Sequence, residues 1–309
     1  MFTHPSESYL VFDGKLVKNA EDAVYTDADV ITLTNNAMMH LFTNIKYHLS
    51  GQEIESLFHP GQATTMLGLL KFPDDFQKST GLNQIWFKDT GATADLETNK
   101  GFAAQQQYII QKPDPNGTFS FRIPLKHIFG FFDDYEKVVY GFKHQLTLVR
   151  KGDNDAIFKT GAVAAVGDVP AIAEPDDGKV VLRKLSWYMP HVLPRDQEKL
   201  ALYKTIESKS SLLVGYRTIQ CDSISVPQTR NFTWRFSVKS APEKPCWIIV
   251  AFQTDKSGNQ QRNPSICYHC NLTSMFVMLN SQSNPAIDYD DMNFTQQKFS
   301  RVYGNAAAF

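Results

Sequence analysis

The chain has 309 residues, a formal net charge of −1 and 20% charged residues. This nearly neutral balance argues against a broadly basic surface, and we expect no direct sequence-specific binding of nucleic acid. No apolar run approaches the roughly 20 residues that a membrane-spanning helix needs, and the N-terminus lacks the basic-then-apolar layout of a secretory signal. The sequence therefore predicts a globular protein that has no membrane span and is not secreted.

The stretch from residue 41 to 55 predicts two strands joined by a turn. The odd-numbered residues of 41–49 are Leu, Thr, Ile, Tyr and Leu, whereas the even-numbered ones are Phe, Asn, Lys and His. Side chains alternate between the two faces of a strand, so the odd-numbered set is expected to be buried. Ser50 and Gly51 then turn the chain, and residues 52–55 begin the second strand. This pattern indicates an antiparallel β protein.

Further along the chain, short β-rich runs alternate with turn signals, and helical patterns are scarce. Helices are expected at residues 60–70 and 194–203, and residues 74–105 are expected to form a long loop. The remaining strands are expected at residues 30–34, 108–111, 119–123, 138–150, 180–188, 212–220, 232–238, 247–252 and 275–279. Many short strands with these spacings are typical of a β-sandwich or a jelly roll.

A stretch of small residues, prolines and acids interrupts this pattern between residues 152 and 178. Strand-rich chain lies on both sides of it, which is typical of a linker between domains. We therefore predict a first β domain over residues 1–152, a connector over 153–178 and a second β domain over 179–309.

Motifs for catalysis or cofactor binding are not evident in the sequence, and we expect neither an enzyme nor a cofactor. Cys267, His269 and Cys270 are the nearest candidate for a metal site, because two thiols at i and i+3 resemble half of a zinc site. No second Cys/His pair follows them, so we predict no metal site and interpret the two cysteines as plain thiols near the start of a strand.

Several segments, taken in order, resemble the double jelly-roll major capsid proteins of nucleocytoplasmic large DNA viruses, Polinton-type elements and adintoviruses. Residues 45–55 resemble the family's strand that ends in Gly-Gln-x-Ile-Asp, with Glu55 in place of the aspartate. Residues 123–146 resemble the pair of strands that closes the first roll. Residues 182–203 resemble the strand and helix that open the second roll, and residues 231–253 resemble a hairpin of that roll.

The resemblance implies an all-β fold of two tandem antiparallel jelly-roll sandwiches with a few short helices. Compared with the family, one or two strands are expected to be missing from the end of the second roll, so that this roll is truncated. The residues expected to act in structure and assembly are Gly51, Gln52, Ile54, Pro124, Trp187, Trp234 and Trp247.

The resemblance also implies a function, namely that of a major capsid protein in an icosahedral double-stranded DNA virus or virus-like element. Three copies would form a pseudo-hexameric capsomer that contacts neighbouring capsomers and a minor or penton capsid protein. The protein would be made in the host cytoplasm, assembled inside the cell and found in the virion. The alternative is a non-enzymatic, lectin-like β-sandwich binding module, including a domesticated copy of a viral gene.

Overall fold

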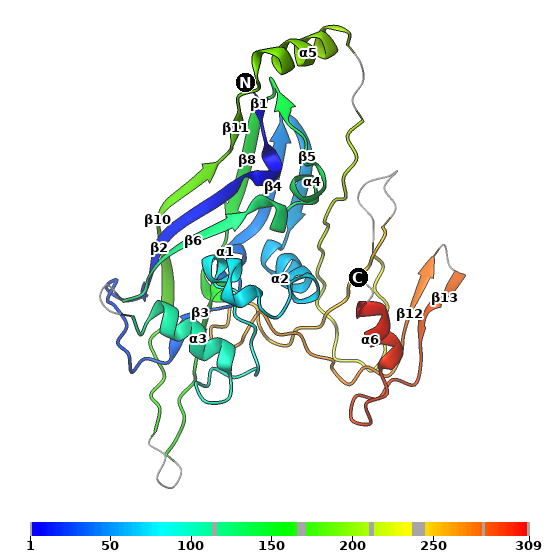
Figure 1. The fold of residues 1–309 in the computed structure, drawn as a ribbon. Helices are drawn as coiled ribbons and strands as arrows, with labels where there is room; N and C mark the ends of the chain where they lie inside the picture. The colour runs from blue at the N-terminus through cyan, green and yellow to red at the C-terminus, as the bar shows by residue number, and fades with distance from the viewer. Residues whose placement is uncertain are drawn as a thin grey trace.

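The computed structural model describes residues 2–112, 116–165, 171–209, 213–236, 245–279 and 282–307. Within these residues the strands form five small antiparallel sheets, accompanied by short helices (Figure 1). The all-β class that the sequence predicts is confirmed.

One three-stranded sheet has β2 (Tyr9–Lys18) at its centre, between β6 (Thr118–Pro124) and β10 (Gly178–Tyr188). Alternate side chains of β2 are buried, among them Leu10 and Phe12. Gly14 interrupts this apolar series because a Cβ there would collide with the Phe119 ring and the Val181 carbonyl. The sequence analysis did not predict β2, although its buried residues follow the period of a strand.

The second three-stranded sheet contains the predicted hairpin, with β4 (Phe42–Leu49) between β5 (Gln52–Phe58) and β8 (His144–Arg150). Ser50 and Gly51 have φ values of 49° and 86°, as the turn of a tight hairpin requires. The expected alternation holds from Ile45 to His48, and Leu49 is only partly buried against the core. Before Ile45, the register against β8 shifts between Phe42 and Asn44, which leaves Thr43 exposed and buries both neighbours.

The remaining strands form three small sheets. β1 (Phe2–Thr3) lies between β7 (Val139–Tyr140) and β11 (His191–Val192), β3 (Ile31–Leu33) pairs with β9 (Ile157–Lys159), and β12 (Met275–Leu279) pairs with β13 (Gln282–Tyr289). The strands expected at residues 30–34, 119–123, 180–188 and 275–279 are therefore present, and the run 138–150 is divided into β7 and β8.

The helices are short. They are α1 (Ala37–His40), α2 (Pro60–Lys71), α3 (Lys100–Ile109), α4 (Gly130–Asp134), α5 (Asp196–Glu207) and α6 (Ser300–Ala307), with single 3-10 turns at Pro5–Glu7, Phe76–Lys78, Thr80–Gln84, Leu125–His127 and Asn154–Ala156. The helices expected at 60–70 and 194–203 are confirmed as α2 and α5. The strand expected at 108–111 is wrong, because the end of α3 occupies residues 108 and 109. Asn99 caps α3 by accepting a hydrogen bond from the Phe102 N–H at 3.2 Å.

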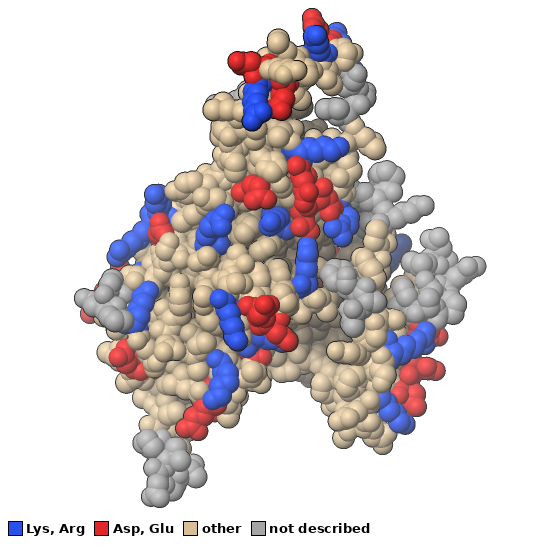
Figure 2. Space-filling view, viewed as in Figure 1, with Lys and Arg blue, Asp and Glu red and all other residues tan. Residues whose placement is uncertain are grey.

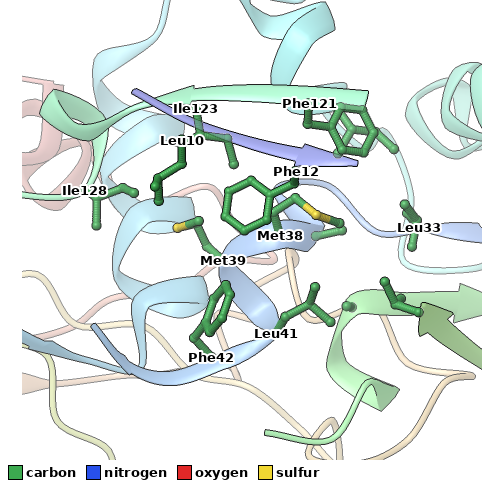
Figure 3. Close-up of a cluster of buried hydrophobic side chains, with 14 of the residues drawn as sticks. Leu10, Phe12, Leu33, Met38, Met39, Leu41, Phe42, Phe121, Ile123 and Ile128 are labelled. Carbon is green, nitrogen blue, oxygen red and sulfur yellow. The ribbon is translucent and has the colours of Figure 1, made fainter. Parts of the chain in front are cut away.

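The principal core lies between the two larger sheets and around α1. Figure 3 shows Phe12 of β2, Met38 and Met39 of α1 and Phe42 of β4 converging on one another beneath β6. The rings of Phe12 and Phe42 are 6.1 Å apart. Burying one such side chain contributes about 1.5–3 kcal/mol, so this cluster is the main source of stability in the described structure.

The two ends of the predicted connector are joined by ion pairs, and its start contains β9, which pairs with β3. Lys159 of β9 is buried, and its Nζ lies 2.8 Å from a carboxylate oxygen of both Glu174 and Asp177. It also donates to the Pro175 carbonyl at 2.7 Å. β10 follows directly and pairs with β2 along its length. β10 begins at the last residue of the connector and thus completes the sheet of β2 and β6. Residues 166–170 of the connector lie outside the described residues.

Candidate assembly surface

Apolar side chains are distributed unequally along the chain. We call the residues up to Val180 the first half and the residues after it the second half. The buried side chains of the principal core all come from residues 10–180. Beyond Val180, the only hydrophobic residues that the described part of the chain buries are Tyr289 and Met292. Most of the exposed large hydrophobic side chains, in contrast, lie after residue 184. An isolated chain therefore leaves much apolar surface of its second half in contact with water.

Helix α5 shows this most clearly. It extends beyond β1 and β11 at one end of the molecule (Figure 1), and none of its residues is buried. Leu200 is 63% exposed, and Ile206 is exposed as well. The ring of Tyr203 contacts those of Phe2 and Tyr140, at centroid distances of 6.3 and 5.8 Å, and attaches the helix to the small β1 sheet. Helices of this length owe most of their stability to packing. Because Leu200 and Ile206 remain exposed, this apolar part of α5 can pack against a partner.

The segments after α5 contain little regular secondary structure within the described residues. The strands expected at 212–220, 232–238 and 247–252 are wrong within the described residues, because residues 213–236 and 245–274 contain no strand and only the single bridge between Phe252 and Tyr268. Residues 212, 237 and 238 lie outside the described residues. Val226, Phe232 and Ile248 in these segments are exposed. These side chains add to the exposed apolar surface of the second half.

One part of this second half is firmly attached to the first. The buried carboxylate of Glu55 in β5 accepts hydrogen bonds from the N–H groups of Gly130 and Phe131, at 3.2 and 3.0 Å, where α4 begins. It also accepts one from the N–H of Ile219 at 2.9 Å. Burial raises the pKa of Glu55 to about 7, because desolvation outweighs the three hydrogen bonds. Glu55 thus joins the first-half hairpin, α4 and the segment after residue 213.

Two neighbouring contacts strengthen this junction. The guanidinium and N–H of Arg217 bind both carboxylate oxygens of Asp134 at 2.6–3.2 Å, which holds the pKa of Asp134 below its usual range. The hydroxyl of Tyr216 donates to the Ile54 carbonyl at 3.2 Å, and its ring meets the edge of Phe131. Asp134, Tyr216 and Arg217 were not predicted from the sequence, since only the fold brings residues so distant in sequence together.

The structure places the predicted assembly residues in different environments. Gly51 and Gln52 are exposed at the tip of the β4–β5 hairpin, whereas Ile54 packs against the core. Pro124 ends β6 and pairs with Tyr9. These four residues lie in or next to strands of the two larger sheets, and the Ile54 carbonyl contacts the junction around Glu55 through Tyr216.

The three predicted tryptophans also differ. Trp187 in β10 packs against the core, and its ring lies 6.3 Å from that of His144. Trp234 is half-buried against Phe236, at a centroid distance of 5.7 Å. Trp247 is 54% exposed. The fourth tryptophan, Trp86, is the most deeply buried of the four and lies in the stretch that the sequence analysis expected to be a loop.

The candidate metal-binding residues Cys267, His269 and Cys270 do not form a metal site in the described structure. The ring of His269 stacks on Phe294 at 4.4 Å, and its Nδ1 accepts a hydrogen bond from the Asn271 N–H at 3.0 Å. Cys267 and Cys270 are free thiols. Among the described residues no group of three or more His, Cys, Asp or Glu side chains is arranged to hold a metal ion.

Charged residues do not define a binding surface on the visible face. Figure 2 shows basic and acidic side chains intermixed over this face and separated by broad uncharged areas. Such a surface does not concentrate charge of one sign, in agreement with the net charge of −1. None of the described helices is both long and apolar enough to cross a membrane.

Comparison with protein families gives a match to the double jelly roll-like domain over residues 31–309. The chain belongs to this family. The match begins after β1 and β2 and covers every later strand and helix, so the double jelly-roll fold expected from the sequence is confirmed at the level of the family. No curated protein matches the chain.

Proposed function

We propose that this double jelly roll-like chain is the major capsid protein of an icosahedral double-stranded DNA virus or virus-like element. We assign it to the lineage of Polinton-type elements, adintoviruses and nucleocytoplasmic large DNA viruses. The double jelly-roll domain is typical of viral capsid proteins, and the family match covers residues 31–309. Two rolls in each chain give six similar wedges in a trimer, and such a block tiles a nearly flat facet.

The observation that carries the proposal is the exposure of apolar side chains in the second half of the chain. A monomer would leave Leu200, Ile248 and many similar side chains in water, whereas contact with other subunits would bury them. The first half, with its buried core, would act as the rigid part of the subunit. The junction around Glu55 would fix the start of the apolar surface relative to that part.

The rest of the proposal follows from this structural role. The protein would have no catalytic activity and would contact itself, neighbouring capsomers and a minor or penton protein. It would be made in the host cytoplasm, assembled inside the cell and found in the virion. Residues 1–152 and 179–309 would form the two rolls and residues 153–178 the connector, with β10 bridging to the sheet of the first roll.

Light scattering of the purified chain tests the proposal. We expect a trimer of three times 35.0 kDa, or 105 kDa. Leu200→Asp introduces a charge into the exposed face of α5 and leaves the buried core unchanged. This variant is therefore expected to shift the measured mass toward 35.0 kDa.

Val24→Asp is the matched control, because Val24 is an exposed apolar residue of the first half. It should remain trimeric. A wild-type chain that stays a monomer at every concentration would contradict the proposal and would favour a lectin-like binding module. Equal dissociation of both variants would show that α5 is not a specific contact.

A further inference from the structure

The loop around residues 253–266 is anchored in the first half of the chain by buried polar groups. Asn263 is 1% exposed, and its side-chain oxygen Oδ1 accepts hydrogen bonds from the Thr34 hydroxyl at 3.2 Å and from the Ser265 N–H at 2.9 Å. The Ser265 hydroxyl in turn donates to the Asn35 carbonyl at 2.9 Å. Two donors on one amide oxygen withdraw electrons from the amide carbon and would stabilise negative charge on that oxygen.

An amine lies beside this amide. Lys256 is 4% exposed, and its Nζ donates to the main-chain carbonyls of Asn263 and Ile266. The ring centroid of Tyr268 is 4.9 Å from the same nitrogen. No carboxylate forms an ion pair with Lys256 in the described part of the chain. Burial lowers the pKa of Lys256 to about 8, so that about a tenth of the amine is neutral and nucleophilic at pH 7, and about half at pH 8.

A buried acid completes the group. Asp89 Oδ1 accepts a hydrogen bond from Asn99 Nδ2 at 2.9 Å, and the Asn263 amide is near enough to lower the pKa of the same carboxyl. Within the described residues, Asp89 Oδ2 and Asn263 Nδ2 are buried without a well-formed hydrogen bond of their own. Burial raises the pKa of Asp89 to about 6, despite the amide contacts and the attraction of Lys256. The carboxyl can therefore both hold and release a proton near neutral pH.

We propose that Lys256 and Asn263 are the site of a spontaneous intramolecular isopeptide bond, with Asp89 as its proton shuttle. An amine, a polarised amide and a buried carboxyl gather here, and Lys256 Nζ already contacts the main-chain oxygen of the residue whose side chain it would attack. The inference does not depend on the proposed role in a capsid.

The reaction needs no oxidant or cofactor. A proton passes from the Lys256 ammonium to the Asp89 carboxylate, and the Nζ lone pair then attacks Cγ of Asn263. The oxygen of the tetrahedral intermediate keeps its hydrogen bonds to Thr34 and Ser265. Asp89 protonates Nδ2 and takes up the proton that Nζ loses, so that the Cγ–Nδ2 bond breaks and ammonia leaves. One carbon–nitrogen bond forms and one breaks.

Because Lys256, Asn263 and Asp89 come from two separate parts of the chain, the bond depends on how far the chain has folded. Lys256 and Asn263 belong to the loop, whereas Asp89 and Thr34 belong to the first half of the chain. The reaction can therefore occur only after the loop has docked. The bond would close residues 256–263 into a ring and make that docked arrangement difficult to reverse.

Mass spectrometry of the intact wild-type chain tests the proposal directly. Loss of one ammonia lowers the mass by about 17 Da, and proteolysis should then yield a branched peptide that joins Lys256 to Asn263. Lys159 provides an internal control, because it is a buried lysine bound by carboxylates and should remain a free amine. Folded wild-type chain with the unmodified mass, after prolonged incubation at about pH 8, would overturn the proposal.

Two variants test whether the bond requires the Lys256 amine and the Asp89 carboxyl. Lys256→Arg removes the nucleophile, and Asp89→Asn removes the proton shuttle at nearly constant volume, so both should keep the full mass of the unreacted chain. Circular dichroism checks that each variant is folded. Full linkage in folded Asp89→Asn would refute the role of Asp89, and the wild-type mass decides the bond itself even where a variant does not fold.

Discussion

Replacing Trp86 with alanine is expected to lower the free energy of unfolding by about 3–5 kcal/mol, the range for a large aromatic side chain lost from a core. Trp86 is 5% exposed, and its ring meets the edge of Phe72 at 4.9 Å and of Phe76 at 6.4 Å. Gly68 of α2 lies against the same ring, so closely that a Cβ there would collide with it. The surroundings are already closely packed around the indole and cannot collapse fully into the space that it leaves. Urea denaturation followed by circular dichroism measures the loss.

Trp247→Ala is the matched control, because it removes the same side chain from a position that is 54% exposed. In the isolated chain it is expected to change the free energy of unfolding by less than about 1 kcal/mol. The sequence analysis placed Trp247 and not Trp86 among the structural residues. Equal losses for the two variants would contradict the assignment of the core to the first half.

Glu55→Gln is expected to remove a pH dependence of stability. The carboxyl titrates at 4.5 when unfolded and at about 7 when folded, since burial disfavours its charged form. A raised carboxyl pKa means that the native state binds more protons than the unfolded state between these values, and so the contribution to stability is complete below pH 4.5 and is lost as the pH rises through 7. The shift corresponds to about 3 kcal/mol.

The quantity to measure is the difference in unfolding free energy between the wild type and Glu55→Gln from pH 4.5 to pH 8. Asp89 and His40 also have shifted pKa values, lying at about 6 and about 3, and taking the difference cancels their contributions. Relative to the variant, the wild type should lose about 3 kcal/mol over this range. A difference that stays constant, or that grows in favour of the wild type as the pH rises, would show that the carboxyl is not buried against Gly130, Phe131 and Ile219.

The β4–β5 hairpin shows what local sequence can predict. Its alternation and its Ser-Gly turn are local signals, and the structure contains the hairpin with the expected turn. The bulge at Thr43 was not predictable in the same way. It appears only in the register against β8, a strand that lies about 100 residues further along the chain.

The region of α3 and Trp86 was mistaken for a loop for a different reason. Its many Gly, Thr, Asn and Asp residues are typical of turns, and they concealed a helix whose start is marked by Asn99. The Asn99 cap was a usable signal, since asparagine is favoured at this position. Trp86 is buried by contacts with Gly68 of α2 and with Phe76 in a 3-10 turn. These tertiary contacts could not be predicted from the sequence alone.

The second half shows the opposite error. Residues 213–236 and 247–252 have the composition of strands, yet within the described residues they form no ladder. The strand propensity of a residue reflects how well its side chain fits a pleated, half-buried surface. It does not tell whether a neighbouring strand is present to pair with. Contacts such as Glu55 with Ile219 and Asp134 with Arg217 join residues more than 80 positions apart and were likewise beyond local prediction.

Electron microscopy of the purified chain tests the central claim, that this protein is a capsid subunit, most directly. The proposal predicts particles with three-fold symmetry and a pseudo-hexagonal outline, since three chains with two rolls each present six similar wedges. Leu200→Asp should reduce their number, and Val24→Asp should not. Averages that show single chains or two-fold dimers at high concentration would contradict the claim.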